Sequence, residues 1–371
     1  MTETVRGHAG PTAPIPMDAP RAAGVVADAN RAGAAPTIAI VGAGRAGSAL
    51  AVALAAAGHT VAAISSRDRG AAESLAARVG ARPVPSALAA IRAAGFTLLT
   101  VPDAAITPVA ASVAGSGASL RGRGVVHCCG SLGVEALAAL RVTGAAVGCL
   151  HPLQALTGVA SAPLVRETLM AIDGDTALRG TLERIVRSLG GHPVVLRPGS
   201  RALYHAAAVL AGNAPLALLA TAAELLAATG MEPGTAEEGL ISLMHGALAN
   251  AGRVGPRAAL TGPVTRGDTA TVAASLAALE DRPEVAELYR VLARATLRLA
   301  GEEGRRDMAQ LLDGRRREDP GVPAERRLSA GGSGNAAGES TRHAAQGART
   351  PGLERSTTPE SPFPTEDSTC R

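Results

Sequence analysis

A glycine-rich segment, Gly42–Gly47, lies directly between a short β-branched run and a long alanine-rich stretch, and it limits the possible folds more than any other feature. The run Ile38–Val41 predicts a buried strand, and the stretch Ala46–Ala57, closed by Gly58, predicts a helix. Because a second strand is expected from Thr60, the spacing corresponds to one βαβ unit with the G-x-G-x-x-G pattern at its first turn. The alternative is a turn whose glycines are incidental. The strand–turn–helix–strand order around the segment favours the dinucleotide-binding interpretation.

Each glycine of this turn meets a geometric need. Gly42 allows the tight turn after the strand, Gly44 lets a pyrophosphate approach the backbone, and Gly47 lets the helix pack closely against the sheet. The positive amino end of the helix, with the backbone amides of Arg45 and Ala46, would then bind the pyrophosphate. The turn therefore predicts a dinucleotide site on a Rossmann domain.

The end of the second strand bears on the choice between NADP(H) and NAD(H). It reads Ser65, Ser66, Arg67, where an NAD enzyme usually places an acidic residue for the ribose 2′-hydroxyl. Two hydroxyls and a guanidinium suit a 2′-phosphate instead, so we favour NADP(H) over NAD(H). Asp68 lies one residue further on, and an Arg67 that simply faces solvent is the alternative.

The chain divides into regions of different pattern. In residues 36–198, short apolar runs alternate with helical stretches, which predicts a doubly wound parallel sheet. In residues 199–303 the strand signals vanish, and we expect a helical domain for substrate binding and dimerisation. Residues 1–35 and 304–371 are predicted to be a disordered leader and a disordered tail. The predicted fold class is an α/β Rossmann domain followed by an all-α C-terminal domain.

Composition removes several classes of protein. All 36 Lys and Arg residues are Arg, so Schiff-base chemistry and a lysine general acid are excluded. The net charge of +4 suits an anionic small-molecule substrate or a dinucleotide phosphate. With 1% aromatic residues and no recognisable module, we expect no nucleic-acid partner. The 4 cysteines lack metal-type spacing and predict neither a disulfide framework nor a metal site.

Nothing in the sequence indicates export or a membrane span. The N-terminus lacks a basic start followed by an apolar core, so it does not resemble a signal peptide. The apolar run Ala206–Leu219 contains Asn213 and Pro215, and we interpret it as too short and too interrupted to span a membrane. We expect a cytoplasmic protein, and the Ala-rich helices favour a homodimer.

A set of short segments outside the glycine turn carries a family resemblance. Together with the turn, the segments are Gly42–Gly47, Val101–Asp103, His127–Gly130, Leu150–Gln154, Tyr204–Ala208, Asn213, Ala259–Pro263 and Arg266–Asp268. They resemble a family of Rossmann-like oxidoreductases whose C-terminal half is classified only as a domain of unknown function, DUF2520. More distantly, the chain is similar to ketopantoate reductase, pyrroline-5-carboxylate reductase and the 6-phosphogluconate dehydrogenase superfamily. That resemblance implies hydride transfer involving a small, carboxylate-bearing substrate.

Two histidines and an asparagine are the candidate catalytic residues. Hydride transfer to a carbonyl or imine needs a proton donor and hydrogen-bond donors, and in a chain without lysine we assign these tasks to histidine. His151 follows an apolar strand in a His-Pro turn that would fix the direction of its imidazole. His205 and Asn213 are eight residues apart on one predicted helix and share a face. A buried pair that satisfies backbone carbonyls is the alternative.

Further contacts are expected around these residues. For the nicotinamide side of the cofactor the candidates are Val101, Pro102, Asp103 and His127, and for the substrate they are Tyr204, Thr261, Arg266 and Asp268. Arg266 could bind a carboxylate with two hydrogen bonds, or it could pair with Asp268 as a structural clamp. The family has a hydroxyl and a small residue where this chain has Cys128 and Cys129, which puts a serine-dependent contact in doubt. We interpret the two cysteines as packing residues rather than a redox switch.

Two functions remain open from the sequence. The first is an NADP-dependent reductase of a small 2-oxo acid or cyclic imine, with ketopantoate as the first concrete substrate and pyrroline-5-carboxylate as the next. The second is a non-catalytic sensor that reports NADP(H) status to a partner through the Arg-rich tail, for example Arg315–Arg317. A catalyst should lose turnover but keep cofactor affinity when His151 or His205 is replaced, whereas a sensor should not.

Overall fold

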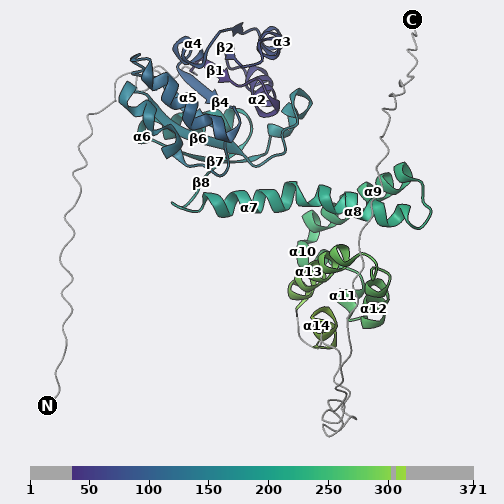
Figure 1. Ribbon diagram of the computed structural model, residues 1–371. Coiled ribbons are helices and arrows are strands. Elements are labelled where there is room, and N and C mark those ends of the chain that lie inside the picture. The colour runs from purple at the N-terminus through teal and green to yellow at the C-terminus, as the bar shows by residue number, and fades with distance from the viewer. Residues whose placement is uncertain (1–35, 302–305, 315–371) are drawn as a thin grey trace, which may run out of the picture. The chain divides into compact units, whose positions relative to one another are not determined.

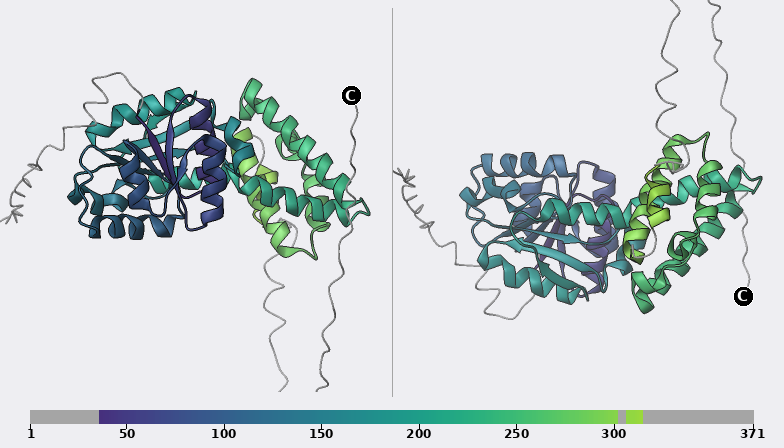
Figure 2. Two further views of the ribbon diagram at one scale, coloured as in Figure 1. Left: turned by 90° about the horizontal axis from the view of Figure 1, so that it is seen from above. Right: turned by 90° about the horizontal axis from the view of Figure 1, so that it is seen from below.

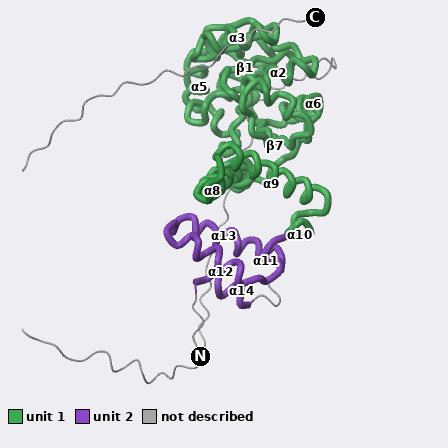
Figure 3. The backbone as a smooth tube through the Cα atoms, turned by 90° about the vertical axis from the view of Figure 1, so that its right-hand side faces the viewer, with its two compact units in different colours: residues 1–260 green, residues 261–371 purple. Residues whose placement is uncertain are grey.

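The computed structural model describes residues 36–301 and 306–314. The chain separates into two units, one ending at Leu260 and the other beginning at Thr261, and each is described by itself (Figure 3). The first unit contains the sheet and the helices that follow it (Figure 1). The predicted domain limits at residues 198 and 303 stay predictions.

An eight-stranded sheet forms the centre of the first unit, in the order β3-β2-β1-β4-β5-β6-β7-β8. The strands are β1 (Ile38–Val41), β2 (Val61–Ser65), β3 (Arg82–Pro83), β4 (Phe96–Leu99), β5 (Gly124–His127), β6 (Ala146–Pro152), β7 (Leu169–Gly174) and β8 (His192–Val195). Because β1 lies between β2 and β4, the strand order reverses at β1. In open α/β sheets ligands bind at such a switch point, outside the carboxyl ends of the strands. The order confirms the predicted Rossmann architecture.

One strand pair departs from the predicted parallel sheet. β6 and β7 are antiparallel, with Pro152 opposite Met170 and Gly148 opposite Gly174. The connection from Pro152 to Leu169 contains a 3₁₀ helix, η2 (Val159–Val165), and returns to the edge of the sheet where β6 ends. A parallel pairing would need a crossover to the opposite edge, which this segment does not make.

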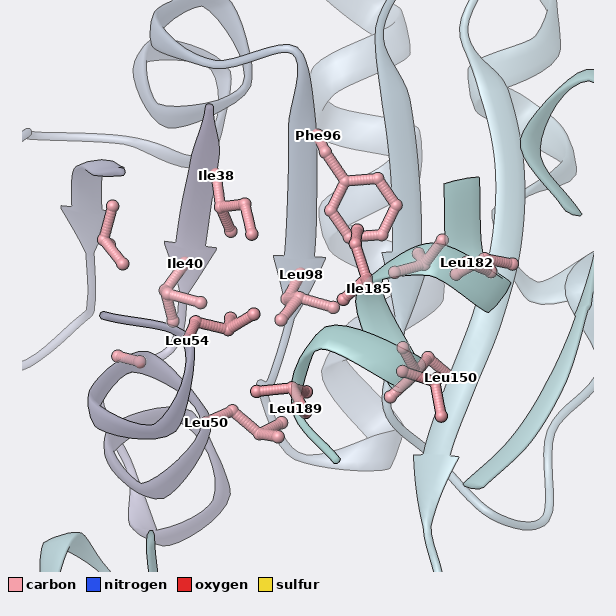
Figure 4. Close-up of a cluster of buried hydrophobic side chains, with 14 of the residues drawn as sticks. Ile38, Ile40, Leu50, Leu54, Phe96, Leu98, Leu150, Leu182, Ile185 and Leu189 are labelled. Carbon is pink, nitrogen blue, oxygen red and sulfur yellow. The ribbon is translucent and has the colours of Figure 1, made fainter. Parts of the chain in front are cut away.

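Helices cover both faces of the sheet, as the views in Figure 2 show. They are α2 (Arg45–Ala56), α3 (Arg69–Val79), α4 (Ala87–Ala93), α5 (Asp103–Gly115), the 3₁₀ helix η1 (Val134–Thr143) and α6 (Thr176–Ser188). The two-residue period of β1 sends Ile38 and Ile40 into one core and Ala39 and Val41 into the other. The first core, which includes Leu50 from α2, is shown in Figure 4. Each fully buried Leu or Ile side chain contributes about 1.5–3 kcal/mol, so the sheet is firmly held.

The helices α7 (Arg201–Gly212), α8 (Ala214–Ala227), α9 (Pro233–Val254) and α10 (Pro256–Ala259) complete the first unit. Within the described ranges, one helical stretch, Arg201–Ala227, is long and apolar enough to cross a membrane by length and composition, and 6% of its most apolar window is buried. Our expectation that this run is too short and interrupted is therefore wrong on length. Pro215 lies in the first turn of α8, where its missing N–H costs nothing, so the helical path continues past Asn213.

The second unit is a small helical cluster. It contains α11 (Pro263–Arg266), α12 (Thr269–Ala277), α13 (Pro283–Ala300) and α14 (Arg306–Leu312). The prediction of a disordered tail from residue 304 is wrong for residues 306–314, because Met308 and Leu312 of α14 are buried against Val272 and Leu297. The predicted leader at residues 1–35 and the remainder of the predicted tail, including Arg315–Arg317, lie outside the described residues.

Candidate active site

The glycine turn connects β1 to α2 at the switch point of the sheet. Gly42 has a φ of +109°, and its N–H donates to the carbonyl of Ser65 at 2.7 Å. A Cβ at Gly47 would overlap the carbonyl oxygen of Gly42 and lie 2.5 Å from Oγ1 of Thr100. Thr100 Oγ1 in turn donates to that carbonyl at 2.7 Å. The turn is therefore fixed by β2 and β4, and two of its positions tolerate only glycine.

The amino end of α2 fits a pyrophosphate. No side chain caps this helix, and its first turn holds no acidic residue. The backbone amides of Arg45 and Ala46 lie in that first turn, where a helix leaves its N–H groups without intrahelical partners. A Cβ at Gly44 would meet no atom of the described residues within 4 Å, so the space in front of it is open to a ligand. The geometry is that of a site for an anionic dinucleotide.

The residues at the end of β2, which are the candidates for the cofactor ribose, differ in their exposure to solvent. Ser65 is buried, Ser66 is half-buried, and Arg67 is exposed. The carboxylate of Asp68 accepts a hydrogen bond from the N–H of Ala71 at 2.9 Å and caps α3. Because this carboxylate is engaged at a helix terminus, Arg67 is the charged side chain left at the strand end, which agrees with the preference for a 2′-phosphate.

His127 holds a loop together. It is fully buried at the end of β5. Its Nε2 lies 2.9 Å from the carbonyl of Gly133, and its Nδ1 accepts from the N–H of Cys129 at 3.3 Å. Both ring nitrogens are used by the backbone, and a cofactor contact of His127 stays a prediction. Its role is to shape the turn from Cys128 to Gly130.

Val101, Pro102 and Asp103 join β4 to α5 at the same edge of the sheet as the glycine turn. Val101 is half-buried, and Pro102 and Asp103 are exposed. Burial lowers the pKa of His127, and the negative charge of Asp103 is one of the influences that oppose this shift. Pro102 and Asp103 are therefore exposed near the turn from Cys128 to Gly130.

His151 and Tyr204 are in direct contact at the carboxyl end of β6. The Nδ1 of His151 lies 2.9 Å from the hydroxyl of Tyr204, and the two rings meet edge to face with centroids 5.5 Å apart. When the hydroxyl donates to Nδ1, the neutral ring carries its proton on Nε2. His205, the next residue on α7, has its ring centroid 6.3 Å from that of His151. The structure therefore brings together three residues predicted from the sequence.

A glycine makes room for these imidazoles. A Cβ at Gly130 would lie 2.8 Å from Nε2 of His151 and 2.8 Å from Nδ1 of His205. Both nitrogens therefore converge on one point above the turn that follows β5. The Nδ1 of His205 is buried and has no hydrogen-bond partner among the described residues. The sequence analysis included Gly130 only within the family resemblance and missed this function.

Arg201 is a charged residue of the site that the sequence analysis missed. It is 9% exposed, its Nη2 contacts the Sγ of Cys149 on β6, and its Nη1 has no partner within the described part of the chain. Burial, followed by the charges of His205 and Arg201, lowers the pKa of His151 to about 4. The sequence does contain a signal for Arg201, because it is the single Arg, Lys, Asp or Glu residue from Gly199 to Ala223.

His151, His205 and Asn213 line one cavity of about 280 Å³. The wall continues through Leu153 and Gln154 after β6 and through neighbouring positions of α7. This cavity lies at the carboxyl edge of the sheet, the edge that also carries the glycine turn. The three candidate catalytic residues therefore share one site, although their chemical roles stay predictions.

The other predicted substrate contacts lie in the second unit. Arg266 ends α11, and the carboxylate of Asp268 accepts from the N–H of Thr271 at 3.0 Å and caps α12. Thr261 and Arg266 are exposed. Bonds to Thr271, followed by the charge of Arg266, lower the pKa of Asp268, so the carboxylate has a structural task here. Binding of the substrate by these residues stays a prediction.

The cysteines after β5 are packing residues in the structure. Cys129 is buried, and its Sγ lies 3.2 Å from the hydroxyl of Ser131. Burial raises the pKa of the Cys128 and Cys129 thiols, which disfavours reactive thiolates. The interpretation of this pair as packing residues agrees with their surroundings.

Strand order, glycine turn and polar cavity together define a Rossmann dinucleotide-binding domain continued by a helical region. A model of a Rossmann-like domain matches residues 19–152, and a model of a domain of unknown function, DUF2520, matches residues 168–296. The chain therefore combines a Rossmann-like domain with a DUF2520 domain, as its motifs indicate. No curated protein sequence matches the chain.

Several solved structures share the fold. A candidate NADP oxidoreductase from Bacteroides fragilis has a TM-score of 0.58 at 23% identity, over 71% of this chain and 98% of that protein. Protein TM1727 from Thermotoga maritima has a TM-score of 0.55 at 23% identity, over 72% of this chain and 99% of that protein. A pyrroline-5-carboxylate reductase from Coxiella burnetii has a TM-score of 0.50 at 18% identity, over 72% of this chain and 98% of that protein. At these identities the likeness shows the fold.

Proposed function

We propose that this protein is an NADP(H)-dependent oxidoreductase that acts on a small carbonyl or imine substrate bearing a carboxylate. One observation carries the proposal: His151, His205 and Asn213 line a single cavity at the sheet edge that also holds the glycine turn. A catalytic pocket beside a dinucleotide cradle is the arrangement that hydride transfer requires. The preference for NADP(H) is supported by Arg67 and by the engagement of Asp68 in a helix cap.

The side chains suggest a division of labour. Bound NADPH would supply the hydride. His151, with a pKa of about 4, is neutral at pH 7, so it acts as a hydrogen-bond donor through Nε2–H while Tyr204 fixes its Nδ1. His205, whose Nδ1 faces the same point, is the proton-transfer residue. Asn213 offers both a donor and an acceptor to the substrate.

The substrate class follows from the charge around the cavity. The guanidinium of Arg201 contacts Cys149, and its positive charge acts on both His151 and Tyr204, which favours an anionic substrate. No carboxylate is among the described residues that line the cavity. A 2-oxo acid of the ketopantoate type is our first assignment. Pyrroline-5-carboxylate is the next, because one protein of the same fold is described as a reductase of that compound.

The proposal is tested in two stages. Calorimetry with NADPH and NADH measures cofactor binding, and NADPH oxidation is then followed with a panel of 2-oxo acids and cyclic imines. His151→Gln and His205→Gln should lower kcat by about 10²–10⁴-fold, the range typical of a lost acid–base group, and leave NADPH affinity unchanged. His192→Gln, at an exposed position of β8, is the matched control. Tight cofactor binding without turnover of any panel member would favour the sensor instead.

We also propose that a second copy of the chain covers the apolar surface of α7, α8 and α9. Leu210 of α7, Leu216 of α8, and Leu243 and Leu248 of α9 are 66–70% exposed within the first unit. Apolar patches of this kind mark interaction surfaces. Light scattering should give twice the chain mass, and Leu243→Glu should give the monomer. A wild-type monomer would contradict the proposal.

A further inference from the structure

A second polar cavity lies at the opposite edge of the sheet from the glycine turn. It has a volume of about 310 Å³ and opens where β4 and β5 begin, at Phe96 and Gly124. Arg121 and Arg123 precede β5, and Arg184 comes from α6. The cavity is therefore separated from the proposed active site by the length of the strands, and nothing in the proposed reaction uses it.

The charge of this cavity is one-sided. Among the described residues that line it, three are arginines and none is Asp or Glu. Like charges gathered around a partly enclosed space repel one another through a medium of reduced dielectric constant. Arginine also presents its donors in a planar fork that matches carboxylate and phosphate oxygens. An anion with several oxygen atoms would relieve the repulsion and accept hydrogen bonds from Arg121 and Arg123.

Hydrogen bonds hold two of the arginines in place, and the stem of the third, the exposed Arg121, packs against the backbone. Nη1 of Arg123 donates to the carbonyl of Ala94 at 2.7 Å. Nη2 of Arg184 donates to Oγ1 of the buried Thr181 at 3.1 Å. The Cγ of Arg121 packs against Gly144, where an added Cβ would lie 2.6 Å away. Pre-positioned donors lower the entropy that a ligand must offset on binding.

The floor of the cavity is apolar and leaves limited space. Phe96 and Leu178 contribute to the lining, and a Cβ at Gly124 would lie 2.7 Å from Cδ1 of Leu178 and 3.3 Å from Cδ2 of Phe96. A volume of about 310 Å³ lies at the lower end of the range for small-molecule sites. A compact ligand fits this space better than a nucleic-acid strand.

We propose that this cavity is a second ligand site, which binds a compact multivalent oxyanion. Phosphate monoesters and tricarboxylates share the required chemistry, namely several charged oxygen atoms on a small body. The proposal goes beyond the oxidoreductase function and does not depend on it, because the cavity shares no residue with the glycine turn or with the His151 cavity.

Calorimetry on the full chain tests the site, with glycerol phosphate and citrate as separate probes. Both titrations are run with and without saturating NADPH, so that binding at the glycine turn is recognised by competition. We expect saturable one-to-one binding that NADPH does not displace. Because a hydrogen bond to a charged group contributes about 1.5–3 kcal/mol, Arg121→Gln and Arg123→Gln should each weaken binding about tenfold or more. The tighter probe identifies the class of oxyanion.

Two further variants keep the result decisive. Arg92→Gln changes an exposed arginine on α4 outside the cavity and should bind both probes as the wild type does. Arg123→Lys keeps the charge but not the fork, so its affinity should fall between wild type and Arg123→Gln, and it provides a second reading if the glutamine variant does not fold. The proposal is overturned if neither probe binds up to about 10 mM, a weak-affinity limit. It is also overturned if Arg92→Gln weakens binding as much as the cavity variants do.

Discussion

The low pKa of His151 makes the stability of this protein depend on pH in a defined way. The folded pKa of about 4 lies below the ordinary value of 6.5, because burial and the charges of His205 and Arg201 disfavour the imidazolium. The unfolded chain therefore binds a proton more readily than the folded one between these two values. Stability linked to His151 is fully present above pH 6.5 and falls as the pH decreases towards 4.

The magnitude follows from the same two pKa values. A pKa that falls from 6.5 to about 4 corresponds to about 3 kcal/mol, since one pKa unit is worth about 1.36 kcal/mol. About 2 kcal/mol of this should be lost between pH 7 and pH 5. That is a large part of the stability of an ordinary domain, which totals about 5–15 kcal/mol.

Urea unfolding of wild type and His151→Gln, at intervals from pH 4.5 to 8, measures the effect. The variant removes the titrating group and keeps a polar side chain, so the difference in unfolding free energy between the two proteins isolates His151 from other titrating groups. We expect this difference to shift by about 2 kcal/mol in favour of the variant between pH 7 and pH 5. Parallel pH profiles for the two proteins would show that the environment of His151 is not what we describe.

Three further predictions concern geometry and charge. Gly130→Ala places a methyl group 2.8 Å from nitrogens of His151 and His205, so kcat should fall while NADPH affinity, measured by calorimetry, stays the same. Gly47→Ala forces a methyl group against the carbonyl of the glycine turn; we expect a loss of about 1–3 kcal/mol in urea unfolding and no measurable NADPH binding, and normal binding would contradict the assigned turn. Arg67→Gln should raise the Kd for NADPH about tenfold or more and leave that for NADH unchanged, because only NADPH has the 2′-phosphate; equal effects on both would contradict the assignment.

The parts of the fold that depend on local pattern could be predicted from the sequence. The glycine turn, the alternation of strands and helices, and the change to helices after residue 198 each rest on periodicity or on backbone geometry, and the structure agrees. The antiparallel β6–β7 pair could not be predicted, because strand direction depends on where a connecting segment ends. α14 was missed because its two buried residues, Met308 and Leu312, lie in an Arg-rich setting and gain their stability from the second unit.

The candidate site was predictable to a similar degree. His151, His205 and Asn213 were selected for their residue type and position, and the structure places them around one cavity. Arg201 was missed, since its importance comes from burial against β6 and not from a motif. His127 was selected because a strand end normally faces the ligand, and the sequence could not show that both nitrogens of this imidazole contact backbone atoms.

The reversal at β7 determines how α7 meets the sheet. β7 and β8 are antiparallel to the other strands, so α7, which follows β8, can extend along β6 in the direction of that strand. Arg201 then contacts Cys149, and Tyr204 contacts His151 further along β6. The five residues between β8 and α7 thus set the rotational phase of the helix. Adding one residue there would turn α7 by roughly 100° and carry its polar side chains away from β6. The length of an exposed loop thereby governs whether the two imidazoles can face each other.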